Sequence, residues 1–209
     1  LTLSDTARLD FTGRWIDTEN ELDLNTSTVA DDSDSRGTSK QLALGLKGRI
    51  ALFDCLTEHR LGISYTNIDR EDRDDIDAVN TADSSLETNR AWKRKAELQN
   101  DYYGLENQVI TLGIETEEDT VRSDISASFL DFFGNPASIN STVSADIHNH
   151  AAYLQDQFTV NDISGTAGLR VDDHDLFDRE VTWRLALSRH FAAIDTRVRG
   201  SFDTGFKAP

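Results

Sequence analysis

Hydrophobic residues recur at every second position in several segments of the chain. Successive side chains of a β-strand point to opposite faces, so such a segment has one apolar face and one polar face. The clearest case is residues 42–52, which is about the length of a tilted strand that crosses a bilayer. Its aliphatic face consists of Leu42, Leu44, Leu46, Ile50 and Leu52, and small or cationic residues lie between them.

The same alternation predicts strands along the rest of the chain. Residues 89–100 are rich in helix formers, but a period of two places Trp92, Ala96 and Leu98 on one side, so we predict a strand there as well. We therefore expect an all-β fold of about nine antiparallel strands, with 1–209 as part of one domain. The other segments are 9–15, 60–66, 110–115, 166–172, 181–188 and 194–203, with a weaker case around 152–158.

The connections between these strands alternate between short and long. Long, acidic loops are expected at about 25–39, 70–88 and 119–148, and the loop 172–179 falls on the same side. Short turns are expected near 53–57, 104–107, 161–164 and 191–193. Short turns on one rim and long loops on the other are typical of an outer-membrane barrel. A soluble β-sandwich or β-barrel with uneven hairpins also alternates apolar and polar residues, and it stays open as an alternative.

Composition narrows the function classes. The 209 residues include 21 Lys and Arg against 38 Asp and Glu, for a net charge of −17, and one cysteine. A disulfide scaffold and a broad basic face for nucleic acid are excluded. No apolar run reaches the length of a membrane helix. No nucleophile motif, zinc-protease motif or phosphate-binding loop is present, so we do not expect an enzyme.

The last third of the chain resembles a known family. It contains Tyr-Leu-Gln-Asp-Gln at 153–157, Ala-Gly-Leu-Arg at 167–170 and Thr-Trp-Arg-Leu-Ala at 182–186. It ends with Gly-Phe-Lys-Ala-Pro at 205–209, preceded by Asp203 where Tyr-Gly is commoner in the family. In this order the motifs resemble TonB-dependent outer-membrane receptors, above all their cobalamin and siderophore branch. The resemblance implies an internal piece of a barrel of about 22 strands, with the plug domain and C-terminal strands outside this chain.

The acidic loops are candidate metal sites. Calcium takes six to eight oxygen ligands, often from aspartates on flexible loops. The resemblance adds that the cobalamin branch uses loop aspartates for calcium. The alternative is a solvated, self-repelling loop. The candidate ligands are Asp31, Asp32, Asp34, Asp69, Asp72, Asp74, Asp75 and Asp77.

Aromatic and histidine residues are the candidate ligand contacts. The apolar group in the longest expected loop either contacts an apolar ligand or folds the loop onto its neighbours, and we favour the second. It consists of Phe129, Leu130, Phe132 and Phe133. His174 is a further loop candidate. His148 and His150 share one strand face, which suits either a metal pair or a position at the rim.

The polar faces of the strands are candidate lumen walls. In a membrane barrel the polar face lines the interior, and an arginine-rich wall suits an anionic ligand or plug carboxylates. The C-terminal candidates are Arg170, Arg184, Arg197 and Arg199, and the earlier strands add Arg14, Lys47, Arg49, Arg60, Lys95, Glu97, Gln99 and Glu115.

Three functions remain open at this point. The resemblance implies a receptor in the bacterial outer membrane that takes up cobalamin or a ferric siderophore, with TonB, outer-membrane lipid and the substrate as partners. A barrel without TonB, such as a porin or adhesin, is the second. A soluble, acidic, calcium-binding β-domain is the third.

Overall fold

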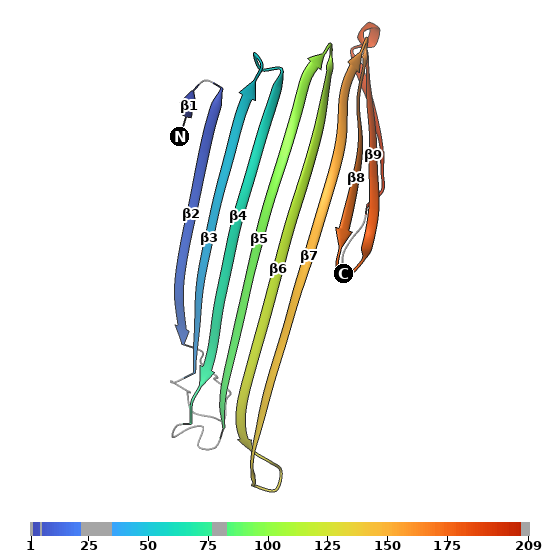
Figure 1. Ribbon diagram of the computed structural model, residues 1–209. Helices are drawn as coiled ribbons and strands as arrows, with labels where there is room; N and C mark the ends of the chain where they lie inside the picture. Colours follow the sequence, from blue (N-terminus) through green and yellow to red (C-terminus); the bar gives the residue numbers. More distant parts are fainter. Residues whose placement is uncertain (1, 5, 22–34, 77–82, 206–209) are drawn as a thin grey trace.

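The computed structural model describes residues 2–4, 6–21, 35–76 and 83–205, which form a single antiparallel sheet in chain order (Figure 1). Each strand pairs only with its neighbours in the sequence. The described strands are β1 (Thr2–Ser4), β2 (Ala7–Glu21), β3 (Arg36–Leu52), β4 (Thr57–Asp74), β5 (Ser84–Leu105), β6 (Gln108–Leu130), β7 (Pro136–Val160), β8 (Ile163–His174), β9 (Asp178–Phe191) and β10 (Thr196–Asp203). Nine long strands, after the short β1, agree with the number that the alternation predicts.

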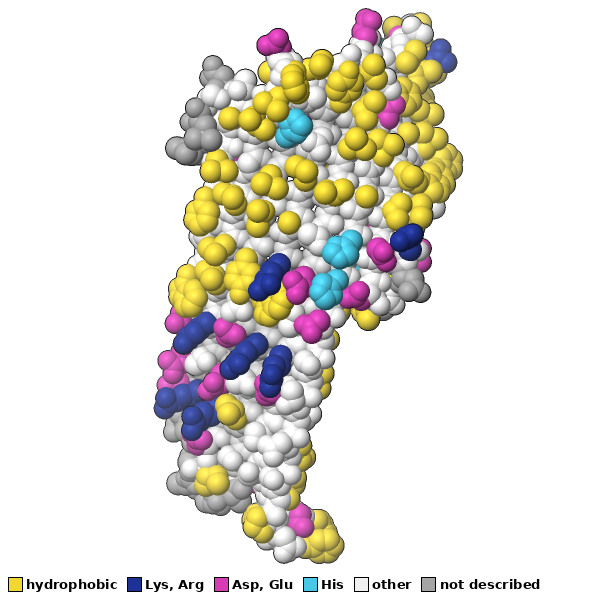
Figure 2. All heavy atoms as spheres, viewed as in Figure 1, with side chains coloured by type: hydrophobic (Ala, Val, Ile, Leu, Met, Phe, Trp, Pro, Cys, Tyr) yellow, Lys and Arg dark blue, Asp and Glu magenta, His cyan; other side chains and the backbone are white. Residues whose placement is uncertain are grey.

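One face of the sheet is apolar across nearly its whole width. In a single register row, Leu61, Leu98 and Ile114 lie side by side on β4, β5 and β6. Figure 2 shows hydrophobic side chains spread across this part of the face, which we call the apolar band. Within the described residues no second layer covers it, and Leu112 and Ile114 are 54% and 59% exposed. A β-sandwich buries such a face against a second sheet, so this sheet does not form one by itself.

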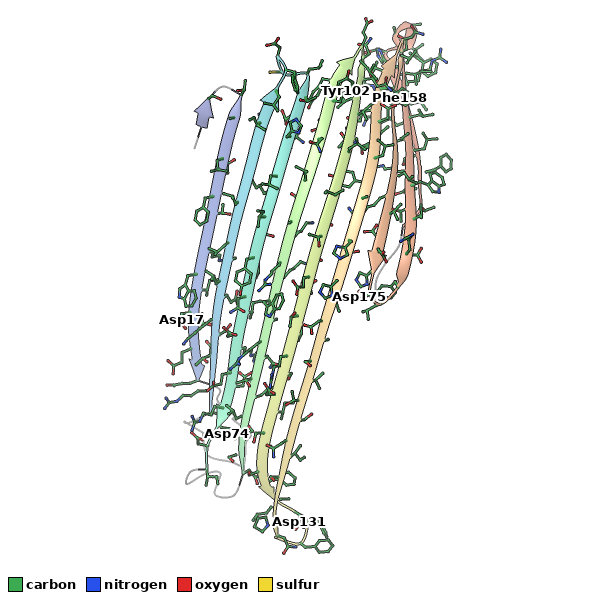
Figure 3. The ribbon with its side chains drawn as sticks, in the orientation of Figure 1. Asp17, Asp74, Tyr102, Asp131, Phe158 and Asp175 are labelled. Carbon is green, nitrogen blue, oxygen red and sulfur yellow. The ribbon has the colours of Figure 1, made fainter. Side chains whose placement is uncertain are left out.

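Aromatic side chains mark the two borders of the apolar band. Trp15, Tyr65 and Trp92 lie on this face toward the long hairpins. Tyr102 and Phe158, which are labelled in Figure 3, lie toward the short turns. The ten steps from Trp92 to Tyr102 cover about 34 Å of strand, or about 26 Å at a tilt of about 40°. This height is close to the apolar band of outer-membrane barrels, about 25 Å.

The short turns lie where the alternation predicts them, but two of the expected long loops are wrong. Strand β6 continues to Leu130 and β7 begins at Pro136, so most of the expected loop 119–148 is a hairpin with its turn at 131–135. Strand β4 likewise continues to Asp74, and β5 begins at Ser84. The expected loop at 25–39 lies largely outside the described residues, although Arg36 already belongs to β3.

Several charge-rich stretches of the strands, including the extensions of β4 and β6, contain ion pairs between residues of one strand. Residues two apart share a face, so an arginine and an aspartate separated by one residue can pair directly. The sequence Arg-x-Asp forms such a pair five times, each at 2.8 Å. The pairs are Arg8–Asp10, Arg70–Asp72, Arg73–Asp75, Arg122–Asp124 and Arg170–Asp172. A charge-rich run is therefore compatible with a strand, provided that opposite charges alternate in this way.

The structure contains one short 3-10 helix (Ala192–Ile194) in its described part. No helix among the described residues is long and apolar enough to cross a membrane.

The polar face is tightly packed where a glycine lies under a tyrosine. Gly113 on β6 is directly opposite Tyr153 on β7, and a Cβ at Gly113 would overlap the tyrosine ring. The Tyr153 hydroxyl donates a hydrogen bond to Gln99 Oε1 at 3.2 Å, so moving the ring would break this bond.

We therefore expect Gly113→Ala to lower the free energy of unfolding by about 1 kcal/mol in the complete protein, because the alanine overpacks this site. Urea unfolding in lipid vesicles, followed by tryptophan fluorescence, measures the change. Gly200→Ala is the control, since no atom lies within 4 Å of its added Cβ. Equal effects of the two variants would contradict the packing argument.

Candidate functional site

The polar face carries two clusters of paired charges. In the first, Glu58 on β4 accepts hydrogen bonds from Arg49 and Arg60, and Arg60 lies 2.6 Å from its Oε1. Arg60 also pairs with Asp101 at 3.3 Å, and Thr111 donates to Asp101 at 2.6 Å. Glu58 and Asp101 are only 5% and 4% exposed. Two buried carboxylates thus neutralise two arginines that lie opposite each other on β3 and β4.

The second cluster connects β5, β6 and β8. Glu115 lies between two cations, with Lys95 Nζ at 2.9 Å and Arg170 Nη2 at 3.1 Å. Arg170 also pairs with Asp172 at 2.8 Å. Cations and carboxylates alternate in this cluster, so their charges balance. The ion pair between Glu115 and Arg170 also connects β6 to β8, which are not neighbours in the sheet.

The four arginines predicted for the lumen all lie on the polar face, because along each strand they alternate with the residues of the apolar band. Arg170 is paired as described. For Arg184, Arg197 and Arg199, no carboxylate of the described residues lies within ion-pair distance. Arg184 and Arg199 line a cavity of about 930 Å³ together with Tyr103, Gln157 and Thr166. This end of the wall therefore carries arginines without ion pairs, with Asp203 opposite Arg184 in the register, whereas the arginines of the two clusters are paired.

The predicted calcium ligands that the structure describes are not brought together as one group. Asp69, Asp72 and Asp74 lie in β4 rather than in a loop, and Asp75 follows directly. Asp69 is on the opposite face from Asp72 and Asp74, because strand residues alternate. Asp72 is paired with Arg70, and Asp75 with Arg73.

The remaining predicted ligands, Asp31, Asp32, Asp34 and Asp77, lie outside the described residues. No group of three or more metal-binding side chains occurs in the part of the chain that the structure describes. Calcium binding by these loops stays a prediction.

The tip of the β6–β7 hairpin is ordered by one side chain. Asp131 Oδ1 accepts the backbone N–H groups of Phe133 and Asn135, at 2.9 and 2.8 Å, and Asn135 Nδ2 donates to Oδ2 at 3.3 Å. Gly134 supplies the positive φ of 80° that the turn requires. The hydrogen bonds from Asn135, and then that from Phe133, hold the pKa of Asp131 below its usual value.

The aromatic residues of this tip point away from the sheet. Phe132 and Phe133 are 97% and 83% exposed, and their rings meet edge to face at 5.6 Å. Phe129 lies within β6, before the turn, and is half-buried. We expected this group to fold the loop onto its neighbours, and this is wrong for Phe132 and Phe133. They lie in the turn of the β6–β7 hairpin, which extends beyond every other described strand, so no neighbouring strand is there to pack against (Figure 1).

The histidines lie near the border of the apolar band. His148 and His150 share the apolar face of β7, as predicted, and a strand interior rather than a loop holds them. His148 Nδ1 lies 2.8 Å from Asp175, and His150 Nδ1 lies 2.9 Å from Thr116 Oγ1. His174 is the last residue of β8 and packs against the Phe177 ring at 5.0 Å.

An uncovered apolar face with aromatic borders, backed by a face of paired charges, defines the wall of an outer-membrane β-barrel. The comparison with family models agrees: residues 2–209 match the model described as TonB dependent receptor-like, beta-barrel. The chain belongs to this family, and its location is the bacterial outer membrane. The comparison with curated proteins gave no match.

Solved structures show the same fold at low sequence identity. The outer-membrane transporter YddB from Escherichia coli aligns with a TM-score of 0.67 and 15% identity, over 96% of this chain and 30% of its own. The ferric citrate transporter FecA aligns with a TM-score of 0.62 and 13% identity, over 96% and 33%. The RagAB peptide importer aligns at 0.58 and 10%, over 81% and 22%. The chain thus spans about a third or less of the length of these transporters.

We expect Glu115→Ala to cost about 2 kcal/mol of unfolding free energy in the complete protein, because Lys95 and Arg170 lose the carboxylate that bridges them. Chemical unfolding in vesicles gives the value. Glu106→Ala, in the exposed turn between β5 and β6, serves as the control and should change little. A loss at Glu106 as large as that at Glu115 would show that the bridge does not contribute.

The tip should open in acid. A carboxyl whose folded pKa is lowered stabilises the turn above its unfolded pKa, about 3.9, and this contribution is lost as the pH falls through the folded value. Hydrogen-exchange protection factors of the Phe133 and Asn135 amides should therefore stay constant from neutral pH down to about pH 4 and fall as the pH drops further through the lowered pKa of Asp131. Asp131→Asn should abolish this pH dependence. Unchanged protection down to about pH 2 in the unmodified protein would contradict the role of Asp131.

Proposed function

We propose that this chain forms part of the barrel wall of a TonB-dependent transporter that takes up a scarce nutrient across the outer membrane. The observation that carries the proposal is the two-faced sheet, with a lipid-facing apolar band and a charged inner wall, in a chain of this family. No carboxylate pair or nucleophile site suggests catalysis in the described residues, so the proposed activity is transport. Energy comes from TonB through a plug domain in the complete protein.

The proposed substrate class follows from the resemblance of the C-terminal motifs and from the arginines of the polar face. Cobalamin or a ferric siderophore is the expected substrate, following the resemblance of the C-terminal motifs. Among the relatives by fold, FecA is named for ferric citrate and RagAB for peptides, so the fold itself is compatible with several cargoes. The end of the polar face around Arg184 and Arg199, whose guanidinium groups form no ion pair within the described residues, suits an anionic substrate.

Growth experiments test the proposal. A strain that lacks the complete gene should lose growth on limiting cobalamin or on limiting iron with a siderophore, and the gene should restore it only when TonB is active. Restoration without TonB would support a porin-like barrel instead. Normal growth of the deletion strain on every tested source of cobalamin and iron would contradict uptake of these nutrients.

The hairpin tip gives a second test. We expect Phe132→Ser with Phe133→Ser to weaken substrate binding to whole cells about tenfold, because two exposed aromatic rings on an ordered turn are lost. Phe53→Ser is the matched control, since Phe53 is also exposed but lies in a turn at the opposite rim. Equal binding by the tip variant and the control would exclude the tip from the substrate site.

A further inference from the structure

Strand β7 is longer than the strand beside it, so one of its edges is open. Strand β8 pairs with β7 only as far as Asn149. The turn after β8 makes the last contacts, where Asp175 N–H donates to His148 O at 3.1 Å and Asp175 Oδ2 accepts the His148 N–H at 2.8 Å. Beyond this point β7 extends to Pro136 and, among the described strands, pairs with β6 alone (Figure 1). We call residues 137–147 the open edge.

The open edge carries a row of backbone groups that have no partner in the described part of the chain. His148 directs both its N–H and its C=O toward the β8 side, so every second residue before it does the same. Within the described residues nothing bonds to these groups, and the residues that carry them are exposed. They are Ser138, Asn140, Thr142, Ser144 and Asp146. Because the groups recur about every 6.8 Å, another extended backbone is the partner that matches all of them.

The sequence of the open edge does not protect it against pairing. Exposed edges are usually blunted by lysine, proline, a bulge or an inward-pointing charge. Residues 137–147 contain no lysine, arginine, proline or glycine, and their register with β6 is unbroken. Ile139, Thr142 and Val143 are β-branched residues that favour strands. The open edge is therefore a straight template for one more strand.

The side chains next to the open edge determine which strand fits. Ile139 and Val143 lie on the same side of β7 as Tyr153 of the polar face, and they are 53% and 64% exposed. On β6, Val121 and Ile125 lie on this side as well, 50% and 40% exposed. The other side of the open edge, which continues the apolar band, carries only polar residues. The two sides have thus exchanged character beyond the band.

Neither the rest of the barrel wall nor a second copy of the chain suits this edge. Barrel closure pairs the outer edges of the sheet, but β8 already takes the place beside β7 and turns back at Asp175. A second copy in the same membrane crosses it in the same direction, so the two β7 strands cannot run antiparallel. A strand from another protein has neither restriction.

We propose that the open edge binds an extended segment of a different protein as an added antiparallel strand. The segment alternates apolar residues, which extend the side of Ile139 and Val143, with polar residues on the opposite side. A lysine or arginine opposite Asp146 pairs with the one charged residue of the edge. Backbone hydrogen bonds supply the affinity, and the alternation sets the register. The contact does not depend on the substrate that the barrel transports.

The first test uses the complete protein in detergent micelles and a synthetic peptide of alternating threonine and valine with one terminal lysine. In the antiparallel register the threonine N–H groups point toward β7, and the valine N–H groups point away from it. N-methylation of the threonines should therefore weaken binding about tenfold, whereas the isomer that is N-methylated on its valines should bind like the unmodified peptide. Equal binding of the two isomers, or no binding of the unmodified peptide, would overturn the proposal.

Hydrogen exchange shows whether the edge is free. In the protein alone, the Ser138 and Ser144 amides should exchange fast, and the Ile139 and Val143 amides, which point toward β6, should exchange slowly. The peptide should slow exchange at Ser138 and Ser144. Slow exchange at these two amides without peptide would show that another segment of the protein already covers the edge, which would overturn the proposal.

A substitution then locates the peptide. Ser144→Pro removes one N–H of the open edge and leaves the hydrogen bonds to β6 in place, so peptide binding should fall about tenfold. Ser144→Thr keeps the N–H and is the matched control, which should bind as the unmodified protein does. Unchanged binding by Ser144→Pro, or an equal loss in both variants, would place the peptide elsewhere.

Discussion

A strand that crosses lipid must find a partner for every backbone N–H and C=O within the sheet, because no water is available there. The rest of this structure depends on that constraint. It explains why each strand pairs with its neighbours in sequence across the whole height of the apolar band. Pairing fixes the register, and the register assigns every side chain to the lipid face or to the polar face.

The two faces satisfy different requirements with the same backbone. On the lipid face, burial in hydrocarbon stabilises aliphatic residues that have no protein layer over them. On the polar face, nearly buried carboxylates such as Glu58 and Glu115 each bridge two cations, so the wall carries charge without isolated ions. The arginines near Arg184 depart from this balance, because they form no ion pair within the described residues.

The alternation of hydrophobic residues predicted the strands within the band, including 89–100, because lipid on one side imposes a strict period of two. It failed beyond the band, where both faces meet water and hydrophobic residues are fewer and, in β6 and β7, lie mostly on the other face. Residues 70–74 and 119–130 fall in predicted loops for this reason, although Arg-x-Asp spacing is a visible signal for strands at Arg70 and Arg122. The pairing of Glu115 with Arg170 was not predictable, since it depends on a register that joins β6 to β8 across β7.

The assignment of the two faces can be measured directly on β6 in the complete protein reconstituted in lipid. Spin labels placed one at a time at residues 110–115 report collisions with oxygen, which concentrates in hydrocarbon. Labels at Ile110, Leu112 and Ile114 should show high oxygen contact, and labels at Thr111, Gly113 and Glu115 should show low contact. A profile without this alternation, or with the opposite phase, would contradict a membrane-spanning wall with its polar face inward.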